Sequence, residues 1–213
     1  MKKILQLVPV VVLIYLIIGI IKWNTTTIFA SLISITLITI TNILQKKTKI
    51  PNHLKLLIYI FILTAEVLGE IYHFYNKVWY FDIIIHTYSS FVISYIGYYI
   101  IKNTKINKKL IILFILSFSM MCESLWEIFE FTTDRVLKTD MQKDTIITEI
   151  TSTYLSNNNT PYTISVEEAS LNNISLTDQY KGYIDIGLYD TISDMTCALL
   201  GALTFIIIIK KRL

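Results

Sequence analysis

Apolar residues gather into six long stretches that are separated by polar segments. Each stretch approaches the length of about 20 apolar residues that an α-helix needs to cross a bilayer. The stretches span residues 4–21, 27–45, 54–74, 81–101, 109–131 and 189–209. The pattern therefore predicts an all-α polytopic membrane protein with six transmembrane helices, the first of which is retained rather than cleaved as a signal peptide.

One long segment, residues 132–188, lacks this apolar character. It is rich in Thr, Ser and Asn and carries four basic against eight acidic residues. It is too long for a plain connection, and we expect residues 144–155 to form a strand or a short amphipathic helix. The predicted organisation is therefore helices one to five in residues 1–131, an extracytoplasmic loop in 132–188, and the sixth helix with a cytoplasmic tail in 189–213.

The basic residues predict how the helices are oriented. Thirteen of the 19 lie on one side of the predicted bundle, at the two chain ends and in segments 46–55 and 102–109, with no acidic residue among them. The two short loops on the other side carry one lysine each, Lys22 and Lys77. Cytoplasmic loops are enriched in Lys and Arg, so we expect a multi-pass protein of the cell membrane with both termini in the cytoplasm.

The composition excludes several classes of protein. Charged residues make up 16% of the chain, against about 25% in a soluble domain, so the lipid bilayer is the expected partner. The net charge of +3 comes from dispersed lysines, which argues against a nucleic-acid partner. Two cysteines cannot form a disulfide framework. The excess of Ile, and of Lys over Arg, indicates an A/T-rich bacterial genome.

Ionisable residues inside the predicted helices are the strongest functional signal, because charge within a bilayer is costly. Four helices carry them, always three or four residues apart, which places each set on one helical face. The sets are Glu66, Glu70 and His73; Asp82 and His86; Glu123, Glu127 and Glu130; and Asp190 and Asp194.

Their expected depth places these groups near one side of the membrane. At a rise of about 1.5 Å per residue, Glu70, His86, Glu127 and Asp194 lie about 6–8 Å below the extracytoplasmic edge. A second layer at the edge itself contains His73, Asp82, Glu130 and Asp190. We therefore expect one shared cluster that opens to the extracytoplasmic face.

So many carboxylates cannot all stay charged and unpaired in a medium of low dielectric constant. A bound cation, shared protons or a wet cavity could each resolve the conflict. Carboxylate with imidazole suits Zn, Mn or Fe, and carboxylates alone suit Mg or Ca, so a divalent metal is the expected cofactor and its identity stays open. The predicted ligands are Asp82, His86, Glu127, Glu130, Asp190, Asp194, Glu70 and Glu123, and the predicted catalytic residues are Glu127 and His86.

Three segments carry a resemblance to a known family. FDIIIH (81–86), SLWEIFEF (124–131) and YDTISDM (189–195), with Gly-Ala downstream, resemble the YjdF-like bacterial membrane-spanning proteins and, more distantly, the VanZ-like proteins. The resemblance implies an uncharacterised family without a settled activity. It also implies a set of site residues, namely Asp82, His86, Glu127, Glu130, Asp190 and Asp194.

Three functions remain open at this point. The first is a metal-dependent membrane hydrolase or transferase acting on envelope or lipid-linked substrates, with Glu127 as the base. The second is a cation- or proton-coupled carrier that uses the carboxylates as a relay. The third is a non-catalytic membrane partner or resistance protein, in which the cluster serves helix packing only.

The predicted topology is tested by labelling a cysteine placed at Asn157 after Cys122 and Cys197 are replaced. We expect an impermeant maleimide to label intact cells at this position, because residues 132–188 are predicted to be extracytoplasmic. A cysteine placed at Lys105 is the matched control and should react only after permeabilisation. Labelling of position 157 from the cytoplasmic side alone would contradict the orientation.

Overall fold

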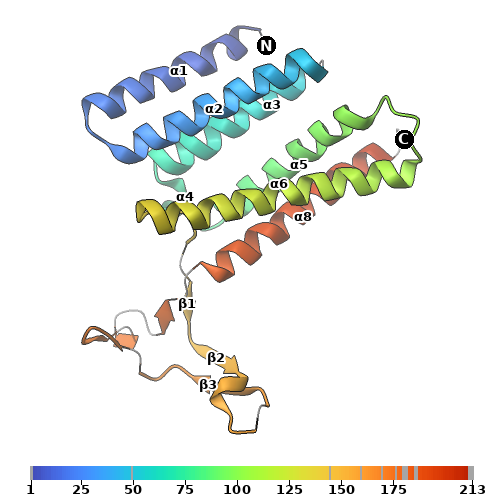
Figure 1. The fold of residues 1–213 in the computed structure, drawn as a ribbon. Coiled ribbons are helices and arrows are strands. Elements are labelled where there is room, and N and C mark those ends of the chain that lie inside the picture. Colours follow the sequence, from blue (N-terminus) through green and yellow to red (C-terminus); the bar gives the residue numbers. More distant parts are fainter. Residues whose placement is uncertain are drawn as a thin grey trace. The chain divides into compact units, whose positions relative to one another are not determined.

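The computed structural model describes residues 2–48, 50–143, 145–158, 160–168, 170–175, 177–178, 182–184 and 187–210 (Figure 1). The chain forms two compact units. Met1–Ser124 together with Asp194–Leu213 form the first, which we call the helical unit, and Leu125–Ser193 form the second, which we call the loop unit.

Helices dominate the described chain. They are α1 (Lys2–Ile21), α2 (Thr25–Thr48), α3 (Asn52–Ile62), the π-helix η1 (Leu63–Ile71), α4 (Phe74–Lys77), α5 (Phe81–Ile101), α6 (Lys108–Leu137) and α8 (Leu188–Lys210). Five of these described helices, α1, α2, α5, α6 and α8, are long and apolar enough to cross a membrane. The predicted all-α polytopic membrane fold is thus confirmed, with a difference at the third span.

The predicted third span is not a single α-helix. The α-helical part, α3, ends at Ile62, and the chain continues as the π-helix η1. The wider turn follows from i→i+5 bonding, as in the bond from Tyr72 N to Val67 O at 3.0 Å. The prediction that His73 shares the face of Glu66 and Glu70 is wrong, because His73 adopts a left-handed conformation (φ 59°) and lies outside the helix.

Two apolar clusters hold the helical unit together, and α5 contributes to both. The first joins α1, α2, α3 and α5, and the second joins α5, α6 and α8. Phe91 and Tyr95 of α5 pack against both clusters. The buried members of the first are Val8, Val12, Ile38, Ile50, Leu54, Ile58, Tyr59, Ile62 and Val92, and those of the second are Ile101, Ile111, Ile115, Phe205, Ile206 and Ile209.

Small residues bring α8 against α5. Ala198 and Ala202 are fully buried, and a Cβ atom on Gly201 would collide with the carbonyl oxygen of Thr87. Close backbone approach at small residues is the usual packing mode of membrane helices, because lipid supplies no hydrophobic force between them. The contact holds the middle of α8 beside the second turn of α5.

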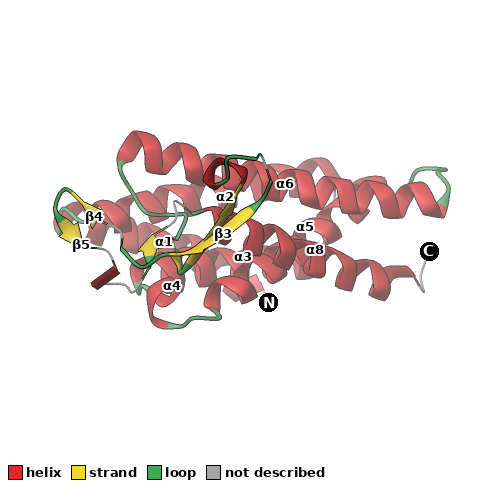
Figure 2. Ribbon diagram, turned by 90° about the horizontal axis from the view of Figure 1, so that it is seen from below, coloured by secondary structure: helices red, strands yellow, loops and turns green. Residues whose placement is uncertain are grey.

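The loop unit contains the strands (Figure 2). β1 (Ile146–Ile147) pairs with β6 (Tyr183–Ile184), and β4 (Ser170–Leu171) pairs with β5 (Ile174–Ser175). β2 (Glu149–Ser152) pairs antiparallel with β3 (Tyr162–Ser165), and the 3-10 helix η2 (Thr153–Leu155) follows β2. Of the two structures expected for residues 144–155, the described residues therefore form mainly strand.

Acidic side chains organise the backbone at both ends of this loop. Asp134, near the end of α6, accepts hydrogen bonds from Met141 N at 2.8 Å and Gln142 N at 2.9 Å. Asp190, in the first turn of α8, accepts one from Lys143 N at 2.7 Å. These bonds satisfy backbone donors that regular secondary structure leaves without partners.

The substitution Gly201→Ala tests the close contact between α5 and α8. We expect it to destabilise the protein by about 1–3 kcal/mol, because the new methyl group meets backbone that cannot rotate away. Gly97→Ala is the matched control, since its Cβ would approach only the movable side chain of Phe118, at 2.9 Å from the nearest atom. Thermal unfolding in detergent measures both variants, and equal losses would contradict the proposed role of Gly201.

Candidate metal centre

The first turns of α5 position two of the candidate side chains. The helix begins at Phe81, so Asp82 lies in its first turn and His86 lies one turn further on. This i, i+4 spacing brings the carboxylate next to the ring, with Asp82 Oδ1 3.4 Å from His86 Nε2. His86 is buried, whereas the Asp82 side chain keeps 23% of its surface exposed.

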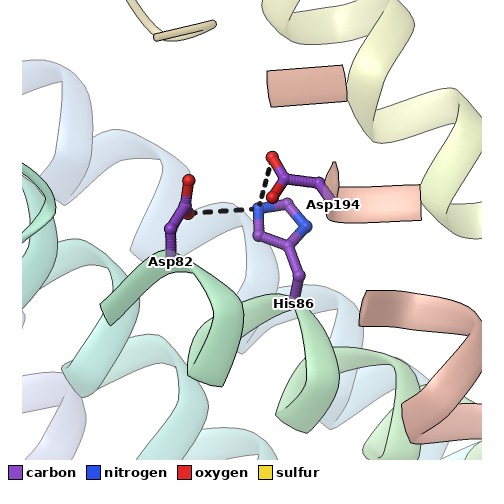
Figure 3. A group of neighbouring side chains, drawn as sticks. All are labelled: Asp82, His86 and Asp194. Atoms are coloured by element: carbon purple, nitrogen blue, oxygen red, sulfur yellow. Dashed lines mark ion pairs between the residues drawn. The ribbon is translucent and has the colours of Figure 1, made fainter. Parts of the chain in front are cut away.

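The third side chain comes from α8, far away in the sequence. Asp194 Oδ2 lies 3.4 Å from the same nitrogen, His86 Nε2, and the Asp194 side chain is buried (Figure 3). The imidazole Nε2 therefore faces two carboxylates, one from its own helix and one from α8. The close packing of Gly201 on α5 fixes the distance between the two helices that makes this possible.

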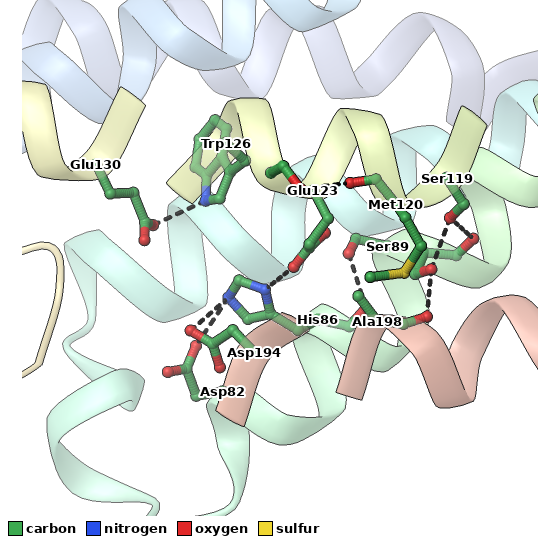
Figure 4. Close-up of polar contacts among 12 residues, drawn as sticks. Asp82, His86, Ser89, Ser119, Met120, Glu123, Trp126, Glu130, Asp194 and Ala198 are labelled. Carbon is green, nitrogen blue, oxygen red and sulfur yellow. Dashed lines mark hydrogen bonds and ion pairs between the residues drawn. The ribbon is translucent and has the colours of Figure 1, made fainter. Parts of the chain in front are cut away.

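The other ring nitrogen faces a third carboxylate. Glu123 of α6 is buried, and its Oε1 pairs with His86 Nδ1 (Figure 4). When the ring proton is on Nδ1, where Glu123 accepts it, the lone pair of Nε2 is directed toward Asp82 and Asp194. This carboxylate–histidine arrangement is the one that orients a metal-binding imidazole in proteins.

The spacing of the donor atoms fits a bound cation. Asp82, His86 and Asp194 each offer one ligand atom, and these atoms all lie within 4.8 Å of one another. Two ligands at about 2.0–2.1 Å from a tetrahedral ion are about 3.3–3.4 Å apart. The two separations of 3.4 Å at His86 Nε2 match that edge length. Nitrogen with carboxylate oxygen suits Zn, Mn or Fe.

A buried serine network lies next to the candidate site and joins the same three helices. Ser90 of α5 donates to the carbonyl oxygen of Ala198 on α8, and Ser119 Oγ of α6 lies 2.7 Å from Ser90 Oγ. Figure 4 shows Ser119 and Ala198 near the candidate site. The sequence did not reveal this network, because a serine in a helix usually bonds to a carbonyl of its own helix.

The other predicted ligands are not members of the group that Asp82, His86 and Asp194 form. Among the described residues, no group of three or more potential ligands includes Glu66 or Glu70 of η1. Glu127 and Glu130 are buried on the part of α6 that belongs to the loop unit, and Glu130 accepts a hydrogen bond from Trp126 Nε1 of its own helix at 2.7 Å. Asp190 binds the backbone of the loop. Their predicted metal-binding roles stay predictions.

The chain matches a known protein family over its full length. A family of predicted membrane proteins, DUF2238, matches residues 1–213. The chain belongs to this family. Over 94 residues it is also 36% identical to an uncharacterised protein of Thermotoga maritima. That match covers 42% of this chain and 48% of the relative, so the chain spans about half the length of the curated relative that it matches. No solved structure matches the chain.

Membership of DUF2238 agrees with the helices described above, and both support a multi-pass membrane protein associated with the bilayer. The family description names no reaction and no ligand. The chemistry that the protein can perform therefore depends on the side chains around His86.

Proposed function

We propose that this DUF2238 protein holds a divalent metal ion within the membrane and uses it for hydrolysis or group transfer on lipid-linked or envelope substrates. One observation carries the proposal. His86 Nε2 lies between Asp82 and Asp194, while Glu123 holds the opposite ring nitrogen. The resemblance of residues 81–86 and 189–195 to the YjdF-like proteins supports the same residues without adding a reaction.

The charge balance supports a cation at this position. Residues 81–101, 110–131 and 189–209 contain no Lys or Arg, so no basic side chain of these stretches can neutralise Asp82, Glu123 and Asp194. Buried carboxylates without a counter-charge are strongly disfavoured. A divalent cation between Asp82, His86 and Asp194 would neutralise two carboxylates, and an Nδ1 proton shared with Glu123 would stabilise the third.

Three protein ligands leave room for a water molecule, as in catalytic metal sites. A metal ion there would lower the pKa of its bound water to about 7 and so supply a nucleophile. Asp82 and Asp194 would anchor the site from two helices, and Glu123 would keep the His86 ring oriented. The partly exposed Asp82, in the first turn of α5, marks the side from which water and substrate would enter.

The location of the site argues for an amphiphilic substrate. His86 lies only about 6–9 Å from the start of α5 along the helix axis, which places it close to the headgroup depth of a bilayer. A polar linkage attached to a lipid tail can reach this depth without leaving the membrane. Glu127, one turn beyond Glu123 on α6, keeps its predicted role as general base as part of this proposal.

A second candidate function rests on the same distances. A protonated His86 would form ion pairs with Asp82 and Asp194 at 3.4 Å and with Glu123, and would then serve packing only. The two candidates differ in one respect that can be measured, because only the first requires a metal ion.

The metal content of protein purified without chelator distinguishes the two candidate functions. We expect close to equimolar metal by mass spectrometry, and loss of most of it in His86→Ala and Asp194→Asn, which remove ligands. Glu123→Ala should weaken metal affinity by about 10–100-fold, because it removes the partner that orients the ring. Glu149→Gln is the control, since Glu149 is an exposed residue of β2, and it should keep the metal.

The same samples give a stability readout. A ligand at a hundredfold excess over its Kd stabilises the native state by about 2.7 kcal/mol, so a chelator should lower the melting temperature of the wild type and leave His86→Ala almost unchanged. If the wild type purified without chelator contains no metal, and its melting temperature is the same with and without chelator, the metal proposal is overturned and the packing role is favoured.

A further inference from the structure

A groove separate from the residues around His86 lies at the end of the helical unit where α1 turns into α2. It is formed by α1, the α1–α2 turn, the start of α2 and the end of η1, and its volume is about 590 Å³. Binding pockets in proteins typically measure about 300–1,000 Å³. None of Asp82, His86, Glu123 and Asp194 lines it.

One wall of the groove is apolar and follows α1. Val11, Ile14 and Ile18 line it from α1, and Ile71 faces them from η1. Positions 11, 14 and 18 lie on one helical face and cover about 10 Å of the helix axis. Ile14 and Ile18 remain exposed in the helical unit, as side chains that contact an acyl chain would be.

The end of the groove near the turn is polar and positively charged. Lys22 is the one charged residue among those that the structure shows lining it, and Asn24 lies beside it in the turn. About 10 Å further along α1 from Lys22, the hydroxyl groups of Tyr15 and Tyr72 are 3.0 Å apart and join α1 to the residue that follows η1. A cation with an amide donor beside it, as Lys22 and Asn24 offer, suits a phosphate group.

The polar end and the apolar wall follow one another along a helix that crosses the membrane, as the headgroup and the tail of a lipid do. We propose that this groove binds one anionic phospholipid, with an acyl chain along Val11, Ile14 and Ile18 and the phosphate near Lys22 and Asn24 in the turn. The positive charge of Lys22 favours an anionic headgroup over a zwitterionic one. A free phosphate would use only the polar end.

The test uses delipidated full-length protein in detergent, with lipid binding measured by native mass spectrometry. Phosphatidylglycerol, phosphatidylcholine and inorganic phosphate are the three probes. We expect the wild type to retain phosphatidylglycerol in preference to phosphatidylcholine. Lys22→Gln should reduce this preference by about fivefold, the contribution of one lysine next to an anionic lipid.

Two further variants keep the result interpretable. Lys105→Gln removes another exposed lysine, from a different loop, and should leave the preference unchanged. Ile18→Trp fills the apolar wall without changing charge, and it should lower the retention of both lipids. His86→Ala should not alter lipid binding, so failure of the metal proposal and failure of the lipid proposal are distinguishable.

Equal retention of the two lipids by the wild type, or an unchanged preference in Lys22→Gln, would overturn the proposal. Competition by inorganic phosphate at concentrations comparable to the lipid would show a phosphate site instead, and would equally overturn it.

Discussion

His86 is buried with carboxylates at both of its ring nitrogens, inside a helical unit whose exposed surface is largely apolar. The free-energy cost of burying Glu123 and Asp194 next to the partly exposed Asp82 is the constraint on which the surrounding structure depends. Each partner comes from a different position in the sequence, so the three helices that carry them must be held at fixed distances. A small displacement of α8 would separate Asp194 from His86 and leave a buried charge without its partner.

The packing around the cluster supplies that rigidity. Gly201 lets α8 touch the backbone of α5, and the serine network of Ser90, Ser119 and Ala198 joins α5, α6 and α8 within the apolar interior. The central helix α5 also packs through Phe91 and Tyr95 against both apolar clusters. The helix α5 therefore has two roles. It packs against both apolar clusters, and it carries two of the proposed metal ligands in its first two turns.

Much of this arrangement could be predicted from the sequence, because it depends on helical spacing. The spacing of Asp82 and His86 predicts their contact, and the lack of Lys and Arg predicts the need for a counter-charge. The sequence could not show that Glu123 rather than Glu127 pairs with Nδ1, because both lie on one helical face and the choice depends on tertiary packing. The sequence also could not show the π-helix, because the apolar pattern of residues 54–74 is compatible with either helix type. The left-handed conformation of His73 depends on the turn that follows it.

X-ray absorption at the zinc edge, on detergent-solubilised protein loaded with one equivalent of zinc, tests the central claim most directly. We predict a first shell of nitrogen and oxygen donors at about 2.0–2.2 Å, with outer-shell scattering from a single imidazole that disappears in His86→Ala. A shell of sulfur at about 2.3 Å, or a spectrum of hydrated zinc that His86→Ala does not change, would contradict a metal centre held by Asp82, His86 and Asp194.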